Sequence, residues 1–267
     1  MADIHRGFRD VDRSGEEQSF IQFLDLANQL PSIGRYRERM LELHPIKGSA
    51  TVLDVGCGLG HETIRIAGLV DSDGRTAGID GSELLIDEAR RRAHRIGVSV
   101  DFQVGDAHNL TFDDDSFDLC RAERVFLYLE DPAKALDEMA RVTRAGGHII
   151  IFDFDYGATF FDSDFPSMTR EIETLIRNDA KNPAIGKELP HLMRRAGLEV
   201  EAIIPTTLTA TTDITRRLSA NVLSKGIADG LFAEHEVAAW WREQTAMETS
   251  GTLHHGYQGY IVAAAKP

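Results

Sequence analysis

A glycine-rich turn that directly follows a short apolar run constrains this chain more than any other feature. Thr51–Val55 (TVLDV) favours β structure and ends at glycines, which predicts a buried parallel strand. A helical pattern follows from His61 to Leu69. Glycines let a chain turn sharply from strand to helix and let a ligand lie close to bare backbone. The segment therefore predicts an α/β fold with a ligand site at this turn.

The same order of strand and helix repeats between about residue 50 and residue 155. Ser82 is predicted to cap one helix, Asp131-Pro132 to open another, and Gly146-Gly147 to stop the second. Such repeats indicate a Rossmann-like, doubly wound, mostly parallel sheet, here with seven strands. The strands expected after the first lie near residues 76–80, 99–104, 117–122, 148–152, 200–208 and 257–264.

Three parts of one integrated domain are expected. Residues 1–47 form a helical N-terminal cap or lid, and residues 48–155 form the ligand-binding core. Residues 156–267 complete the sheet and add helical insertions, including two helices between 211 and 250, before the last strand. These additions are long enough to wall a pocket at the carboxyl edge of the sheet, where open α/β sheets bind ligands.

The charge balance disfavours nucleic acid and anionic membranes as partners. The chain of 267 residues carries 29 basic and 43 acidic side chains, a net charge of -14. We interpret its one dense basic cluster (Arg90, Arg91, Arg92 and Arg95) as the solvated face of a helix. No run approaches the roughly 18 apolar residues of a membrane span, and the polar residues 1–18 do not resemble a signal peptide.

The cysteines predict neither disulfides nor a metal site. Cys57 and Cys120 are two isolated residues outside any C-x-x-C pattern. A reducing cytoplasm is therefore the expected compartment. No group of histidines and acids stands at metal-ligand spacing, so no metal is expected.

The spacing of the glycines separates two interpretations of the turn. A dinucleotide fingerprint runs G-x-G-x-x-G, which would place its third glycine at His61, whereas this chain has Gly56, Gly58 and Gly60. Asp54 precedes them, and its carboxylate would repel a pyrophosphate but suits a ligand that carries an ammonium and a sulfonium. An NAD(P)-dependent oxidoreductase is therefore the less favoured alternative.

The segment from Val52 to Gly60 resembles motif I of class I S-adenosylmethionine (SAM)-dependent methyltransferases. Later blocks resemble the ubiquinone/menaquinone-biosynthesis-type (methyltransferase domain 11-like) branch over roughly residues 50–155: Phe117-Asp118, Leu127 to Pro132, Glu138 to Val142 and Ala145-Gly146-Gly147. Two positions depart from the branch. Ala145 stands where proline is common, and Tyr128 stands where many relatives have a polar residue such as histidine.

The resemblance implies SAM as the cofactor and S-adenosylhomocysteine as the product. Asp54 would orient the methionyl ammonium, Asp80 would accept hydrogen bonds from the ribose hydroxyls, and Asp106 with Ala107 would meet the adenine. The predicted cofactor-binding residues are Asp54, Gly56, Cys57, Gly58, Gly60, Asp80, Gly81, Ser82, Gly105, Asp106, Ala107 and Glu123.

No catalytic base is assigned, and the reaction is expected to be an in-line displacement that needs mainly alignment. Candidates near the reacting atoms are Glu123, Tyr128, His61 and His191. An ion pair with Arg121 or Arg124 is the alternative role of Glu123. Asp153 and Asp155 are expected at the same carboxyl edge of the sheet, and Arg35, Tyr36 and Arg37 over the site as a lid.

The acceptor is expected to be a small natural product or a quinone- or phenol-like molecule. Aromatic residues gather just after the fifth strand and either face this acceptor or form ordinary core. They are Phe152, Phe154, Tyr156, Phe160, Phe161 and Phe165. Whether carbon, oxygen or nitrogen is methylated stays open, as does a non-catalytic SAM-binding role. The N-terminal helices could serve as a surface for a homo-oligomer.

Overall fold

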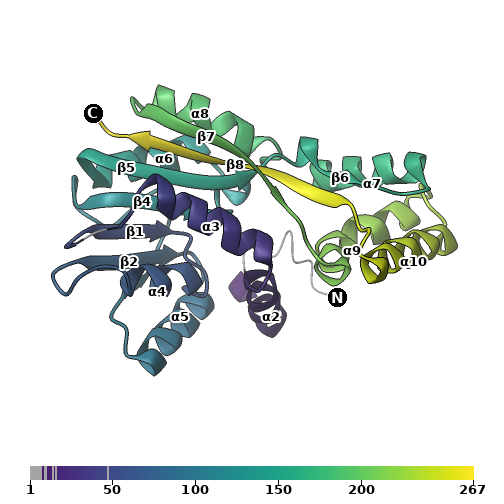
Figure 1. Ribbon diagram of the computed structural model, residues 1–267, viewed down its shortest axis with the longest axis horizontal. Coiled ribbons are helices and arrows are strands. Elements are labelled where there is room, and N and C mark those ends of the chain that lie inside the picture. The colour runs from purple at the N-terminus through teal and green to yellow at the C-terminus, as the bar shows by residue number, and fades with distance from the viewer. Residues whose placement is uncertain (1–7, 9–10, 14, 16, 47) are drawn as a thin grey trace.

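A computed structural model describes residues 8, 11–13, 15, 17–46 and 48–267 as a mixed α/β fold (Figure 1). Its sheet has the order β3-β2-β1-β4-β5-β8-β6, with β7 paired to β8. The prediction of a mostly parallel, Rossmann-like sheet is confirmed, although the described residues form eight strands rather than seven. The strands are β1 (Thr51–Val55), β2 (Arg75–Asp80), β3 (Asp101–Val104), β4 (Phe117–Glu123), β5 (Thr143–Phe154), β6 (Phe160–Phe161), β7 (Glu199–Leu208) and β8 (His255–Ala265).

The additional strand is the two-residue β6, which pairs with the start of β8. It is too short to produce the alternating pattern by which strands are predicted. Strands β1 to β5 are parallel, and β8 runs antiparallel to both β5 and β7. The chain leaves β1 toward β2 and β3, then returns to place β4 on the other side of β1. This reversal opens a crevice at the carboxyl ends of β1 and β4, where such folds bind ligands.

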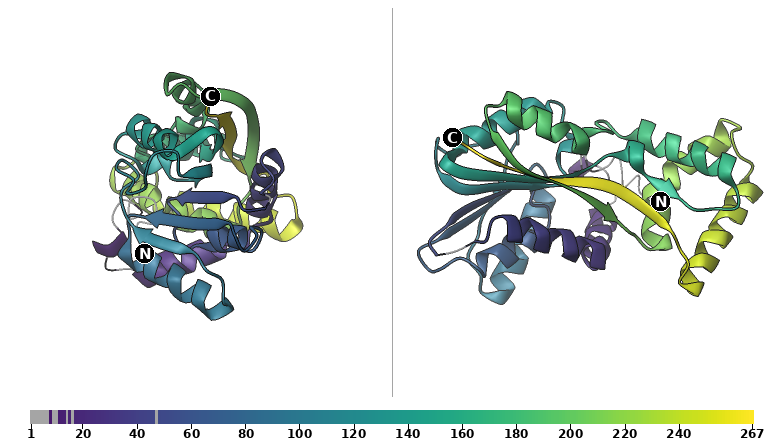
Figure 2. Two further views of the ribbon diagram at one scale, coloured as in Figure 1. Left: turned by 90° about the vertical axis from the view of Figure 1, so that its left-hand side faces the viewer. Right: turned by 45° about the horizontal axis from the view of Figure 1, so that its top comes forward.

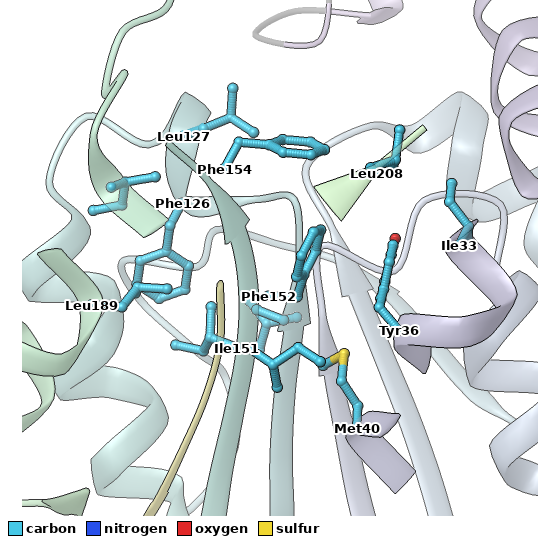
Figure 3. Close-up of a cluster of buried hydrophobic side chains, with 14 of the residues drawn as sticks. Ile33, Tyr36, Met40, Phe126, Leu127, Ile151, Phe152, Phe154, Leu189 and Leu208 are labelled. Atoms are coloured by element: carbon cyan, nitrogen blue, oxygen red, sulfur yellow. The ribbon is translucent and has the colours of Figure 1, made fainter. Parts of the chain in front are cut away.

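Helices cover both faces of the sheet. On β5, Ile151 points toward α8 (Ile185–Arg195), whereas the next residue, Phe152, points toward α3 (Pro31–Leu43) (Figure 3). This alternation follows from the period of two in a strand. The remaining helices of the core are α4 (His61–Ala67), α5 (Glu83–Ile96) and α6 (Pro132–Val142).

Local signals set most helix boundaries as expected. The Ser82 hydroxyl accepts a hydrogen bond from the Leu85 N–H at 3.2 Å, and the Asp131 carboxylate accepts from the Lys134 N–H at 3.0 Å. The prediction that Gly146-Gly147 stop helix α6 is wrong. The helix ends at Val142 and β5 begins at Thr143, so the glycines lie inside a strand. Glycine is compatible with both states and does not distinguish between them.

The N-terminal segment folds against the core as η1 (Val11–Arg13), α2 (Glu17–Asn28) and α3. Phe20, Phe23, Ile33 and Tyr36 are buried there, so the apolar faces of these helices pack within the chain. The homo-oligomer surface expected on them stays a prediction. The expectation about residues 1–18 falls partly on residues 1–7, 9–10, 14 and 16, which lie outside the described part of the chain.

The basic cluster of α5 is only partly a solvated face. Arg90 and Arg91 are at least half exposed and form ion pairs within the helix. Arg92 instead reaches α2, where its Nη1 lies 2.6 Å from Oδ1 of Asp25. The cluster therefore also helps to hold the N-terminal segment.

A helical lobe extends beyond the end of the sheet (Figures 1 and 2). It contains α7 (Pro166–Asp179), α9 (Thr212–Ala228) and α10 (Glu234–Ser250), and β7 and β8 run from the sheet into it. Trp240 of α10 is buried, and its ring packs edge-on against Phe161 at 5.6 Å. No helix within the described ranges combines the length and the apolar character that crossing a bilayer requires.

The central strand carries much of the stability of this fold. Leu53 of β1 is completely buried, and its replacement by alanine leaves a cavity between the sheet and the helices that cover one of its faces. We expect Leu53→Ala to lower the free energy of unfolding by about 2–5 kcal/mol in urea titrations. The matched control is Ile203→Ala on β7, where the side chain is 45% exposed and a change within about 0.5 kcal/mol is expected. Equal losses in the two variants would contradict this assignment of the core.

Candidate functional site

A cavity of about 570 Å³ opens at the carboxyl ends of β1, β2 and β4. Its volume is typical of a site for a small ligand. The glycine turn forms one wall, and the N-terminal segment and the start of α9 close the other side. The cavity is lined by all but one of the predicted cofactor-binding residues, namely Asp54, Gly56, Cys57, Gly58, Asp80, Gly81, Ser82, Gly105, Asp106, Ala107 and Glu123.

The three glycines of the turn have different roles. All three have a positive φ, between 53° and 72°, which favours glycine. A Cβ on Gly56 would lie 2.2 Å from Val125, and one on Gly60 would lie 2.6 Å from the Phe102 ring. A Cβ on Gly58 would meet nothing closer than Leu24 at 3.9 Å. Gly56 and Gly60 thus permit close packing, which explains why Gly60 does not line the cavity, whereas Gly58 leaves space for a ligand.

Asp80 joins the two loops that border the cavity. Its carboxylate accepts hydrogen bonds from the Gly58 N–H at 2.8 Å and from the Ser82 N–H at 3.0 Å. Burial raises the pKa of Asp80, although these backbone donors oppose the shift. A carboxylate accepts about four hydrogen bonds, so capacity remains for a pair of ligand hydroxyls. A Cβ on the neighbouring Gly81 would meet only the Gly105 carbonyl, at 4.0 Å, which leaves this part of the wall open.

Asp54 is buried below the turn. Its two carboxylate oxygens accept from the Thr63 hydroxyl at 2.6 Å and from Nη1 of Arg121 at 2.8 Å. Burial raises the pKa of Asp54, and Arg121 counters the shift. Because both oxygens have protein partners, the geometry suits an indirect influence on a ligand ammonium, through the loop and its charge.

Glu123, at the end of β4, is the centre of a cluster of buried charges. Its carboxylate accepts from the Tyr36 hydroxyl at 2.5 Å, from Arg37 at 2.8 and 2.9 Å, and from Arg121 at 2.8 Å. Arg124 adds an ion pair at 3.2 Å. Burial alone would raise the pKa of Glu123, but the arginines outweigh it and hold the pKa well below its usual range. Glu123 therefore stays ionised, and the geometry favours its alternative role in ion pairs over that of a base.

The other catalytic candidates lie in different surroundings. Tyr128 lines the cavity, with its ring 5.6 Å from that of Phe8. His61 also lines it, but Nε2 is engaged with Asp25 at 2.8 Å, and burial lowers the pKa of the ring. His191 is exposed on α8 and is not among the lining residues. Of these candidates, Glu123, Tyr128 and His61 line the cavity and His191 does not.

Neither Asp153, near the end of β5, nor Asp155, just after it, lines the cavity. The carboxylate of Asp153 accepts from the Leu127 N–H at 3.1 Å and holds the turn η2 (Phe126–Tyr128). Burial raises the pKa of Asp153 to about 7. Asp155 caps the turn η3 (Tyr156–Ala158) by accepting from the Gly157 N–H. Both side chains therefore stabilise turns at the rim of the site.

His108 is a lining residue that sequence reasoning missed. The Asp131 N–H donates to Nε2 of His108 at 3.2 Å, so the proton lies on Nδ1, which donates to Asp106 at 2.6 Å. This chain of contacts fixes the exposed Asp106 side chain beside Ala107. No local pattern identifies it, because Asp131 was predicted only as a helix cap.

Asp12 is a second residue that the sequence did not reveal. Its carboxylate accepts from the Ser82 hydroxyl at 2.5 Å and from the Glu83 N–H at 2.9 Å. It thereby adds a negative charge at the N-terminus of α5, where the helix dipole favours one. This contact fastens the N-terminal segment to the edge of the cavity next to Asp80.

The half of the cavity away from the glycine turn is apolar. Phe154 and Tyr156 of the predicted aromatic group line it, whereas Phe152 stacks on Tyr36 at 4.1 Å and Phe165 is 37% exposed elsewhere. Phe160 and Phe161 lie outside the lining too and pair with β8. The other apolar walls, to which the sequence assigned no role at the acceptor, are Phe8, Phe23, Ala27, Leu30, Ile33, Leu208, Ile214, Leu218 and Tyr257.

The charge cluster around Glu123 makes a prediction about stability. Glu123→Gln keeps the shape of the side chain but leaves Arg37, Arg121 and Arg124 without their shared carboxylate. We expect the free energy of unfolding at pH 7 to fall by about 3–5 kcal/mol in urea titrations.

The pH dependence follows from the lowered pKa of Glu123. Its stabilising effect is present above the unfolded-state pKa, near 4.5, and is lost as the pH falls through the lower folded-state value. The difference in the free energy of unfolding between the wild type and Glu123→Gln should therefore become smaller as the pH falls. The control is Glu38→Gln on α3, whose side chain is 71% exposed. The prediction is contradicted if Glu123→Gln loses less than about 1 kcal/mol of unfolding free energy at pH 7, or if this loss grows as the pH falls.

Comparison with known proteins places the chain in a family. Residues 46–197 match the family model described as a methyltransferase domain. A demethylmenaquinone methyltransferase of Bacillus cereus (strain AH187) is 27% identical over 203 residues, which cover 68% of this chain and 85% of that enzyme. An uncharacterized 37.1 kDa protein in transposon Tn4556 of Streptomyces fradiae is 32% identical over 193 residues, or 70% of this chain. The aligned region spans about half of that relative, 54% of its length.

The fold is also found in a solved structure from Haemonchus contortus. Phosphoethanolamine N-methyltransferase 2 of Haemonchus contortus, in complex with phosphomonomethylethanolamine and S-adenosylhomocysteine, superimposes with a TM-score of 0.63 at 18% identity. The match covers 97% of this chain and 60% of that one. The family match favours the methyltransferase interpretation over the NAD(P)-dependent alternative. The protein therefore belongs to the methyltransferase domain family and is a class I methyltransferase that depends on S-adenosylmethionine.

Proposed function

We propose that the protein methylates a small, largely apolar acceptor of the quinol or phenol type. SAM would occupy the half of the cavity beside the glycine turn, and the acceptor would occupy the apolar half between the N-terminal helices and α9. The observation that carries the proposal is this division of one cavity into a polar half and an apolar half.

The residues of the polar half fit the cofactor. Gly58 and Gly81 leave open wall where a side chain would otherwise intrude, and Asp80 retains the capacity to accept from two ribose hydroxyls. Ala107, held beside Asp106, offers its backbone to an adenine. When bound, SAM supplies a methyl group activated by a sulfonium. The residues of the protein would bind SAM and the acceptor, align the two for the transfer and exclude water from the cavity.

The charges around the cavity favour a cationic ligand over an anionic one. Its described lining contains seven carboxyl groups (Asp12, Asp54, Glu62, Asp80, Asp106, Glu123 and Glu130) and three guanidinium groups. Those three, from Arg37, Arg121 and Arg124, all pair with Glu123. This balance attracts a sulfonium and leaves no uncompensated arginine for a phosphate. A phosphorylated acceptor is therefore disfavoured.

The apolar half supports an acceptor with a ring or chain and few charges. Its walls come from α2, α3, β5, β7, β8 and α9, and they exclude water from the transfer. Similarity to a demethylmenaquinone methyltransferase, whose name denotes a quinone-derived acceptor, supports the same class.

Tyr257 offers one polar contact in this apolar half. Its hydroxyl is buried beside the Thr215 side chain, and burial raises the pKa of the phenol although Thr215 opposes the shift. The group therefore stays protonated, and the side chain would have to turn toward the cavity to donate to an acceptor oxygen, because its oxygen has almost no accessible surface. We infer that Tyr257 orients the acceptor, with alignment rather than a strong base as the main contribution of the protein.

The cofactor half can be tested by calorimetric titration with SAM and with S-adenosylhomocysteine. Asp80→Asn replaces a charged acceptor by a neutral amide, and we expect both ligands to bind about 10- to 100-fold more weakly, as for the loss of charge-assisted hydrogen bonds. Asp87→Asn, at an exposed site of α5, is the control and should bind as the wild type does. Unchanged affinity in a folded Asp80→Asn protein would overturn the assignment of Asp80.

The acceptor half can be tested with SAM labelled in its methyl group and a panel of hydroquinones, phenols, apolar amines and phosphoethanolamine. We expect label to move to hydroquinones or phenols. Leu218→Ala widens the apolar wall and should raise the KM for the preferred acceptor about 10-fold or more, with SAM affinity unchanged. Ile227→Ala, on the same helix but outside the cavity, is the matched control.

Two outcomes would contradict the acceptor class. Transfer confined to phosphoethanolamine would show that an anionic acceptor is preferred. Cofactor binding without transfer to any member of the panel would instead support the non-catalytic alternative. Because cofactor affinity is measured separately, either result leaves the test of Asp80 intact.

A further inference from the structure

Three potential metal ligands meet at the C-terminal end of α3, where it lies against β5 and β7. His44 follows the last turn of α3, His148 lies early in β5, and Glu201 lies on β7. The ligand atoms of these residues all lie within 4.8 Å of one another. It is the one such group among the residues that the structure describes, and no residue of it lines the cavity.

The distances suit a small ion. Nε2 of His44 lies 3.4 Å, and Nε2 of His148 lies 3.6 Å, from Oε2 of Glu201. Ligands at the usual zinc distances of about 2.0–2.2 Å in a tetrahedral arrangement are about 3.3–3.6 Å apart. A metal ion could therefore bind between the three atoms with little change in the two distances from the imidazole nitrogens to the Glu201 carboxylate.

The fold accounts for the meeting of residues so far apart in the chain. Helix α3 lies along β5, so that Tyr36 stacks on Phe152 at 4.1 Å and the ring of His44 lies 3.6 Å from that of His148. Strand β8 separates β5 from β7, and it presents only alanines there, at positions 263 to 265. These small side chains leave space above the strand for His148 and Glu201 to approach each other.

A bulge in β7 places the carboxylate. The register between β7 and β8 shifts between Val200 and Ala202, so Glu201 has no partner in the ladder. Bulges of this kind redirect a side chain. The carboxylate is 47% exposed, and the two imidazoles are 21% and 27% exposed, so an ion could reach the group from solvent.

The surroundings also favour a cation. The C-terminal end of α3 carries the negative end of the helix dipole, next to His44.

We propose that His44, His148 and Glu201 form a binding site for a divalent transition metal ion, with Zn²⁺ the best match to two imidazole nitrogens and one carboxylate oxygen. Water would complete the coordination. The ion would join α3 to β5 and β7. Tyr36 and Arg37, about 12 Å away along the same helix, contact Glu123 at the cavity. The site would thus stabilise the position of the helix that closes the cofactor cavity.

The test is a titration of untagged, chelator-treated protein with Co²⁺, which replaces Zn²⁺ in such sites and absorbs visible light. We expect visible bands that saturate near one equivalent and disappear when Zn²⁺ is added. His44→Ala and His148→Ala should each weaken binding at least about 100-fold, since even groups that only support metal ligands contribute about 10- to 100-fold. His94→Ala, on the exposed face of α5, is the matched control and should bind as the wild type does.

Zn²⁺ should also raise the melting temperature of the wild type and of His94→Ala, but not that of the ligand variants. Glu201→Gln serves as a further ligand variant at an exposed position, in case a histidine variant fails to fold. The proposal is overturned if the folded wild type gives no bands with Co²⁺. It is equally overturned if the bands persist in a folded variant that lacks a ligand.

Discussion

The position of the N-terminal helices depends on one buried carboxylate. Glu123 at the end of β4 gathers Arg37 and Tyr36 from α3 and Arg121 from its own strand, and Arg121 passes the contact on to Asp54 of β1. Buried ion pairs contribute little net stability, because desolvation offsets their attraction. However, any packing of α3 that separates one of these charged groups from its partners leaves a buried charge unpaired, which costs free energy. The cluster therefore specifies where α3 lies on the sheet more than how strongly it binds there.

The placement of α3 determines both of the sites described above. With Tyr36 held at Glu123, the helix runs along β5 and its last turn brings His44 to His148. Ile33, one turn before Tyr36, then faces the apolar half of the cavity. A second fastening of the N-terminal segment is Asp12 at the start of α5. The cavity is thus closed by a segment that is held both by buried charges, which salt screens little, and by apolar packing.

The sequence predicted the features that depend on neighbouring residues. The strand before Gly56, the cap at Ser82 and the acid at Asp80 are local, and their spacing was enough to place them around one cavity. Features that depend on distant packing were missed. The contact of Asp12 with Ser82 joins segments 70 residues apart, and Leu218 and Tyr257 reach the cavity from the lobe. His44, His148 and Glu201 of the proposed metal site share no spacing pattern, because α3, β5 and a bulge bring them together.

The two halves of the cavity differ in how far the sequence predicts them, and the difference has a physical basis. Binding a nucleoside requires backbone that turns tightly at strand ends, and only certain residues at fixed intervals allow it. Enclosing an apolar acceptor requires only volume and an apolar surface, which Phe23, Ile214 and many other combinations can provide. The cofactor half therefore leaves a motif in the sequence and the acceptor half leaves none. Specificity for an apolar acceptor would then reside in the few polar groups of the apolar half, and Tyr257 of β8 carries one of them.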